Sequence, residues 1–386
     1  MSATATAATT TSDRVTESQP RRDGRPRGRL RSGLETAAIY ALSIAGAFVV
    51  SALLVSITGG SASSVLTAIV DGSLRGPGRW GVTLLRAAPL MVVAIGTIIA
   101  NKAGLTNIGQ EGQVLVGAAF AAFVAVRVPG PGPLVLMATV GCGIAAGAVW
   151  AGIAALLRFT RQVPEVITTL LLIFVANQLV VYGLTRRWLL ADRDPARTSR
   201  VDTGELVPTG ARLPGAALLG NRIDLSVVIG VVLALTVTLF IARTVWGYRL
   251  RVLGESPAAA QRSGVSAKGA GSVALMVSGA FAGLAGAMLL TGGASSNRLT
   301  VGFSNNVGWE GLLVALLARN RPLTVIPMAL VFAALRTGAG FLAATGVDRR
   351  IVDVVQALLV LALLIPPAVQ FLRERRHQLT ASIAGG

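Results

Sequence analysis

Residues 225–242 read LSVVIGVVLALTVTLFIA, a stretch without a charged side chain. Such a stretch is typical of a helix that crosses a lipid bilayer, because about 20 apolar residues span the hydrocarbon core. Further apolar runs lie at roughly 36–58, 82–100, 112–126, 133–157, 163–184, 270–291, 308–318, 323–342 and 351–372. The sequence therefore predicts an all-α polytopic membrane protein with about 10 transmembrane helices.

The composition supports this class and excludes others. Of 386 residues, 53% are hydrophobic and only 13% are charged, whereas about 25% of a soluble domain is charged. Outer-membrane barrels alternate in hydrophobicity and lack such long apolar runs. The net charge of +18 does not indicate nucleic-acid binding, because the basic residues lie in the tails and between apolar runs and aromatic residues make up only 5%.

Cysteine and histidine are almost absent. Cys142 is the only cysteine and His377 the only histidine. Disulfides, thiolate metal sites, histidine zinc sites and catalytic triads are therefore excluded. We expect no metal and no cofactor.

Charge and hydropathy divide the chain into three parts. We expect a disordered basic cytoplasmic tail at 1–31, a transmembrane domain at 32–372 and a cytoplasmic tail at 373–386. With ten spans and the N-terminus inside, loop 243–269 is cytoplasmic and loop 185–223 extracytoplasmic. The second assignment conflicts with the positive-inside rule, because this loop holds seven arginines, so its side stays open.

Two apolar runs are too short to span a bilayer as straight helices. The run at 112–126 follows the semi-polar segment 101–111, and the run at 308–318 follows 304–307. Irregular backbone at membrane depth is tolerated only when it is buried in protein or lines a wet cavity. Short or broken helices are therefore predicted near 101–126 and 304–318, both as candidate elements of a translocation path.

Polar side chains beside or within the apolar runs are the candidate lining of that path. A carboxylate at membrane depth is costly, so Glu111 needs partners or water, and capping a helix N-terminus is the alternative role. An interhelical hydrogen bond is the alternative for Asn177, and a bilayer anchor for Trp309. The candidate path residues are Asn107, Glu111, Gln113, Asn177, Asn305, Asn306, Trp309 and Glu310.

A short polar helix is predicted between two spans. Ser256 suits an N-cap, Pro257 the first helical position, and Gly264 a left-handed turn that ends the helix. The result is a basic, capped helix of about two turns at the cytoplasmic surface, with the shape of a part that fits a partner's groove. A solvated linker is the alternative. The residues of the predicted docking helix are Glu255, Ser256, Pro257, Ala258, Ala259, Ala260, Gln261, Arg262 and Gly264.

Five segments in order resemble one family. They are 102–113 (KAGLTNIGQEGQ), 163–170 (VPEVITTL), 254–264 (GESPAAAQRSG), 308–317 (GWEGLLVALL) and 320–323 (NRPL). Over about 80–372 the chain is similar to permease subunits of bacterial ABC importers, in the group of ribose, branched-chain amino acid and nucleoside permeases. The nucleoside branch, linked to basic membrane lipoproteins, resembles it most. Thr106 and Gln110 depart from the family pattern, which weakens the substrate assignment.

The resemblance implies a transporter subunit rather than an enzyme. It implies a second permease subunit, as a homo- or heterodimer, a cytoplasmic ABC ATPase and an extracytoplasmic solute-binding lipoprotein. The chain has no P-loop of its own, so ATP is bound by the partner. The resemblance also implies that 255–264 is the coupling helix, which lies in a groove of the ATPase. It further implies that a small polar solute, most of all a nucleoside, crosses a bacterial plasma membrane by alternating access. A simple-sugar or branched-chain amino acid permease is the alternative, followed by a secondary transporter or channel.

Overall fold

The computed structural model describes residues 49–57, 70–193 and 203–344, with scattered positions between 38 and 46, at 67 and between 354 and 369. The predicted tails at 1–31 and 373–386 lie outside the described residues. The first predicted run, 36–58, is described in part, and the last, 351–372, only at scattered positions.

The predicted all-α polytopic class is confirmed. In the described residues, six segments are long and apolar enough to cross a membrane. They are α3 (Arg79–Lys102), α5 (Gly132–Arg161), α6 (Glu165–Leu184), α7 (Leu225–Arg243), α10 (Ala267–Thr291) and Pro322–Phe341, which joins the 3₁₀ turn η3 (Pro322–Thr324) to α12 (Val325–Ala344). The total of about 10 spans stays a prediction, because two of the runs are incompletely described.

Two helices begin inside the bundle, as the short apolar runs predict. They are α4 (Gln110–Arg127) and α11 (Val307–Leu317). The first turn of α4 is buried, and Gly308 near the start of α11 packs directly on the backbone of Glu111. Each of the two broken regions therefore consists of an irregular segment followed by a half-helix.

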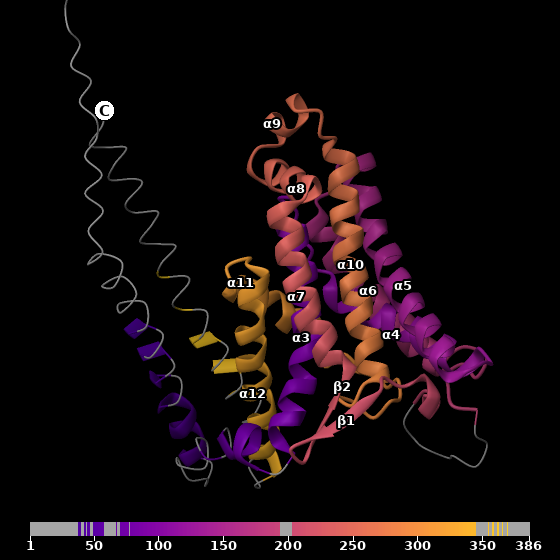
Figure 1. The fold of residues 1–386 in the computed structure, drawn as a ribbon, viewed down its shortest axis with the longest axis vertical. Coiled ribbons are helices and arrows are strands. Elements are labelled where there is room, and N and C mark those ends of the chain that lie inside the picture. Colours follow the sequence, from indigo (N-terminus) through magenta and orange to yellow (C-terminus); the bar gives the residue numbers. More distant parts are fainter. Residues whose placement is uncertain are drawn as a thin grey trace, which may run out of the picture.

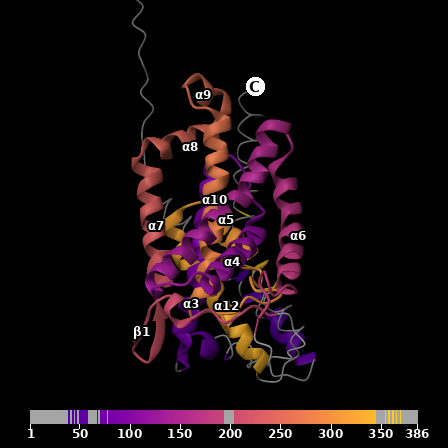
Figure 2. The same cartoon turned by 90° about the vertical axis from the view of Figure 1, so that its right-hand side faces the viewer.

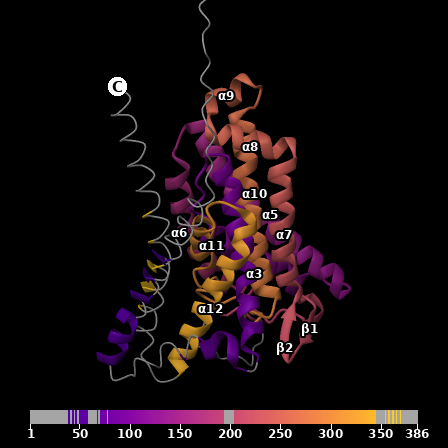
Figure 3. The same ribbon diagram turned by 60° about the vertical axis from the view of Figure 1, so that its left-hand side comes forward.

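Helix α10 lies at the centre of the bundle. It contacts α3, α4 and α5 along its length, while α6 and α7 cover the outside (Figure 1). Figure 3 shows α12 running obliquely beside α3, close to α11. Helix α4 packs on α5, α6 and α10, and α11 packs on α3, α4 and α12.

Glycines allow α5 and α10 to touch backbone to backbone, as the small-residue spacing indicates. The pairs Gly143/Gly147 and Gly279/Gly283 face each other across these helices. A Cβ atom built on Gly283 would overlap the carbonyl oxygen of Gly143, and one on Gly147 would overlap that of Gly279. Gly286 makes the same kind of contact with Val114 of α4.

We expect Gly283→Ala to destabilise the protein. Alanine favours a helix over glycine by about 1 kcal/mol, but at this position its methyl group must push α5 away, and overpacking costs about 1–3 kcal/mol or more. Thermal unfolding of the purified protein in detergent, followed by tryptophan fluorescence, measures the effect. Gly141→Ala is the matched control, because nothing lies within 4 Å of a Cβ atom at this position of α5. Equal melting temperatures for the two variants would contradict this packing.

The two ends of the bundle carry different structures. At one end, α7 turns sharply at Thr244 into α8 (Val245–Glu255), which lies across the tops of α7 and α10 and leads into α9 (Pro257–Arg262) (Figure 2). At the other end lie the π-helical turn η1 (Asp71–Arg75), the 3₁₀ turn η2 (Thr209–Ala211), and a hairpin of β1 (Gly215–Leu218) and β2 (Asn221–Asp224). The described parts of this loop, 185–193 and 203–224, and α9 are therefore at opposite ends.

The β-hairpin was not expected in an all-α chain. Its turn places Leu219 and Gly220 at φ values of 48° and 74°, the left-handed pair that a two-residue hairpin requires. Asn221 fixes it to the bundle, because its side-chain oxygen accepts a hydrogen bond of 3.0 Å from the N–H of Gly81 at the start of α3. Leucine is rare at such a turn, so residue types alone do not predict it.

Candidate functional site

A cluster of amides and hydroxyls fills the space where the chain enters α4. The side chain of Asn107 donates to Gln113 and to Ser278 of α10, both at 2.9 Å. Gln110 donates to Thr97 of α3 at 2.6 Å and to Ser278 at 3.2 Å. All five residues are buried. This cluster hydrogen-bonds the side chain of Asn107 within the protein, although the side-chain oxygen of Gln110 is buried without a hydrogen-bond partner among the described residues.

Asn107 and Gln113 therefore do not reach an open surface in this structure. Their side chains bind each other and α10 instead. Their predicted place on the translocation path stays a prediction, since it requires a conformation in which this cluster opens.

Glu111 joins the two half-helices. It lies in the first turn of α4, is 6% exposed, and accepts a hydrogen bond of 2.7 Å from the N–H of Gly308 in the first turn of α11. Its other oxygen accepts a hydrogen bond from the hydroxyl of Ser304. Helix N-termini carry partial positive charge, so this carboxylate is stabilised by α4 and by α11 together. We name Glu111, Ser304 and Gly308 the half-helix junction.

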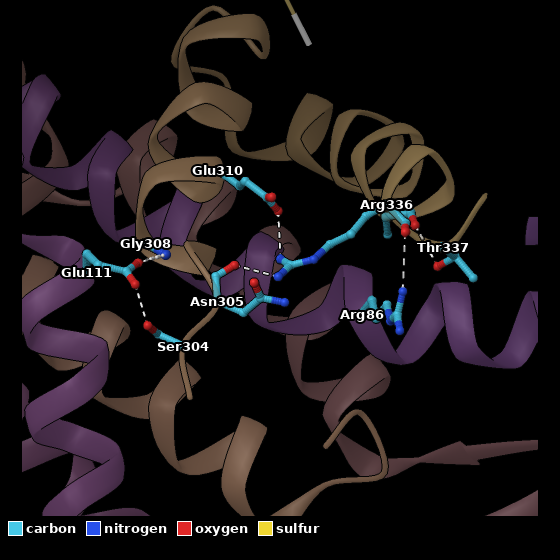
Figure 4. A network of polar contacts seen from close by, with 9 residues as sticks. Arg86, Glu111, Ser304, Asn305, Gly308, Glu310, Arg336 and Thr337 are labelled. Atoms are coloured by element: carbon cyan, nitrogen blue, oxygen red, sulfur yellow. Dashed lines mark hydrogen bonds and ion pairs between the residues drawn. The ribbon is translucent and has the colours of Figure 1, made fainter. Parts of the chain in front are cut away.

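A second polar group lies on the other side of α11 (Figure 4). Arg336 of α12 donates to the carboxylate of Glu310 at 2.9 Å and to the carbonyl oxygen of Asn305 at 2.5 Å. Arg86 of α3 donates to the carbonyl oxygen of Arg336 at 3.4 Å. The Glu310–Arg336 pair is only 12–13% exposed. Two cations, Arg86 and Arg336, and the carboxylate of Glu310 therefore lie close together between α3, α11 and α12.

The segment that leads into α11 carries exposed amides. Asn305 and Asn306 have positive φ values of 47° and 67° and exposed side chains, and Trp309 is half-buried in the next turn. Asparagine tolerates the left-handed conformation that turns the chain into α11. These three residues and Glu310 lie where the chain enters α11, next to Ser304 and Gly308 of the half-helix junction.

Asn177 lies apart from this group. It occupies the middle of α6, and it is exposed together with its neighbour Gln178 on a face that also exposes Phe174 and Leu179. Two amides on the outside of a span need a hydrogen-bonding partner, because lipid offers none.

Sequence reasoning missed Arg86, Arg336, Thr97 and Ser278. A signal existed for the two arginines, because both lie inside predicted apolar runs and a charged residue at membrane depth is a functional candidate by default. Thr97 and Ser278 gave no such signal, since hydroxyls are common in transmembrane helices.

Helix α9 has the predicted local geometry but is shorter. Ser256 caps it by accepting a hydrogen bond of 3.3 Å from Ala259 N–H, and Gly264 has a φ of 76°. Glu255 belongs to α8 rather than to this helix, since the extended backbone of Ser256 separates the two.

The exposed surface of α9 points away from the bundle (Figure 1). Ala260 and the following Val265 are buried and hold the helix in place. Its exposed residues are Pro257, Ala258, Ala259, Gln261 and Arg262.

Interrupted helices that meet inside a bundle of apolar helices are typical of membrane transport proteins. A family model described as the branched-chain amino acid transport system permease component matches residues 81–364. The chain belongs to this family and is the permease subunit of an ABC importer. It is a multi-pass membrane protein and a transporter subunit, not an enzyme. Membership implies a partner ATPase and a substrate-binding protein.

The curated relatives differ in the solute that their names give. The chain is 33% identical to the glucose ABC transporter permease protein TsgB13 of Haloferax volcanii, over 74% of this chain and 76% of the relative. It is 29% identical to the guanosine ABC transporter permease protein NupP of Bacillus subtilis, over 83% and 90%. It is 27% identical to the nucleoside ABC transporter permease protein NupB of Lactococcus lactis, over 79% and 84%.

Proposed function

We propose that this permease carries a nucleoside into a bacterial cell across the plasma membrane. The observation that carries the proposal is the group beside the half-helix junction, where the exposed Asn305 and Asn306 lead into Trp309 and Arg336 donates to the carbonyl oxygen of Asn305. Amides bind the hydroxyls of a ribose, and an indole stacks on a base. Two relatives named for nucleosides or guanosine support the same class.

A simple sugar is the second candidate, supported by the relative named for glucose. Asparagine side chains also bind sugar hydroxyls, but a group that contains Arg86 suits an acceptor-rich base better. A branched-chain amino acid fits the polar group less well, because its side chain is apolar.

The mechanism we propose is alternating access around the half-helix junction. Helix α9 docks in a groove of the cytoplasmic ABC ATPase, so loop 243–269 is cytoplasmic. With the predicted ten spans, both termini are then cytoplasmic as well, and loop 185–223 faces outward. A solute-binding lipoprotein delivers the solute on that side. The exposed amides of Asn177 and Gln178 on α6 support a second permease subunit, identical or different, against this face.

Uptake measurements test which solute the permease transports. The permease, its ATPase and its binding protein are reconstituted in vesicles, and ATP-dependent accumulation of labelled guanosine, ribose, glucose and leucine is compared. We expect guanosine to accumulate and a ten-fold excess of uridine or inosine to compete with it. Accumulation of glucose or leucine alone would overturn the nucleoside assignment and leave the importer class intact. Solute-stabilised melting of the binding protein provides an independent readout.

A further inference from the structure

The polar group around α11 contains more positive than negative charge. Arg86 and Arg336 are the cations, and Glu310, which Arg336 binds at 2.9 Å, is the carboxylate. Arg86 lies in the second turn of α3, so it is about 10 Å inside the end of a helix that spans the membrane. A charged group at this depth faces protein or a wet cavity and needs a partner.

Most hydrogen-bond donors of Arg86 have no partner among the described residues. A guanidinium carries five N–H donors and no acceptor. Within the described ranges 70–193 and 203–344, Arg86 makes one hydrogen bond, the contact of 3.4 Å with the carbonyl oxygen of Arg336, and no ion pair. Arg336 uses its own fork on Glu310 and Asn305. Arg86 is the member of the group whose donors remain available.

The surroundings of Arg86 favour a neutral, acceptor-rich ligand. Glu310 lies in the same group and offsets one of its two positive charges, while Asn305, whose carbonyl oxygen binds Arg336, supplies an exposed amide nearby. A guanidinium recognises two adjacent acceptors with two parallel N–H bonds, as it does with O6 and N7 of guanine. Adenine presents an amino donor at position 6, which a guanidinium cannot accept.

We infer that Arg86 is a specificity-determining residue that binds the O6/N7 edge of a 6-oxopurine nucleoside during passage. The inference rests on the proposed nucleoside function and narrows it to guanosine and inosine over adenosine. Arg336 positions the site by holding Glu310 and the backbone of Asn305, and it is not itself assigned to the solute.

The test compares inosine with adenosine, which differ at position 6 of the base. Uptake of each is measured in vesicles that contain the permease, its ATPase and one binding protein. All variants share the same binding protein, so a change in the inosine-to-adenosine ratio reports on the permease. We expect Arg86→Gln to lower this ratio about ten-fold and Arg86→Lys, which keeps the charge but loses the fork, to lower it as well.

Arg79→Gln is the matched control. Arg79 lies two turns earlier on α3, where its guanidinium packs 4.8 Å from the ring centroid of Phe341. This variant should keep the wild-type ratio. ATPase stimulation and the melting temperature show that each variant is folded and coupled.

An unchanged ratio in folded Arg86→Gln protein overturns the inference while nucleoside transport stands. Failure of the wild type to transport any nucleoside overturns the proposed function instead. Competition by guanosine monophosphate that exceeds that of guanosine and disappears in Arg86→Gln would also overturn the inference, because Arg86 would then bind an anionic group.

Discussion

Ala260→Pro is expected to reduce ATP-driven uptake to background while the protein still inserts into the membrane. The N–H of Ala260 donates a hydrogen bond of 2.9 Å to the carbonyl oxygen of Ser256, and its side chain is fully buried. Proline removes this donor and clashes with the preceding turn, at a cost of about 3 kcal/mol. Since α9 has only six residues, it cannot form around the defect. The proposed docking surface for the ATPase is then lost.

Arg262→Glu provides an independent test of the same surface. This side chain is exposed at the end of α9, so reversing its charge changes the docking surface without disturbing the helix. We expect loss of ATPase stimulation together with loss of uptake. Lys268→Glu is the matched control, because Lys268 is also exposed but lies in the first turn of α10, where an acid is tolerated. Wild-type uptake and stimulation in both Ala260→Pro and Arg262→Glu would contradict the docking assignment.

The features that sequence reasoning predicted well are local ones. The cap at Ser256 and the left-handed Gly264 depend on side chains within a few residues of the turn they make, so their pattern is sufficient. The two broken spans followed from the length of an apolar run beside a polar segment. The four-residue spacing of the glycines in α5 and α10 is visible in the sequence, although only the structure shows which of them meet.

The features that sequence reasoning left open depend on long-range partners. Glu111 had two candidate roles because its neighbours along the chain do not include Ser304 and Gly308, which lie more than 190 residues away. Arg86 and Arg336 lie inside apolar runs, where an average over the window hides a single charge. Their proximity, across 250 residues, follows from the packing of α12 on α3.

The half-helix junction explains why a charged residue is present at the centre of the bundle. A buried carboxylate loses its hydration, and this loss is offset only by hydrogen bonds and favourable dipoles. Both oxygens of Glu111 are hydrogen-bonded, and two helix N-termini point at it. The same carboxylate therefore fixes α4 relative to α11, and any movement of these helices against each other must break or rotate its bonds.

Glu111→Ala is accordingly expected to unfold or strongly destabilise the protein. It leaves the N–H of Gly308 and the hydroxyl of Ser304 without an acceptor, at about 1–3 kcal/mol for each buried group. Glu111→Gln keeps an oxygen for Gly308 and can donate its amide to Ser304. This variant loses only the attraction between the negative charge and the two helix N-termini, which is worth up to about 2 kcal/mol. The melting temperature in detergent should be highest for the wild type, lower for Glu111→Gln and lowest for Glu111→Ala.

Uptake by the glutamine variant then separates the two roles of Glu111. A carboxylate that only joins two helices is replaceable by an amide of the same shape, so Glu111→Gln should retain most of the transport activity. Both oxygens are already hydrogen-bonded within the protein, which favours this result. The half-buried Glu205, in the loop near the opposite end from α9, is the control position, and Glu205→Gln should match the wild type. A Glu111→Gln protein that melts like the wild type but transports nothing would show that the negative charge itself acts on the solute path.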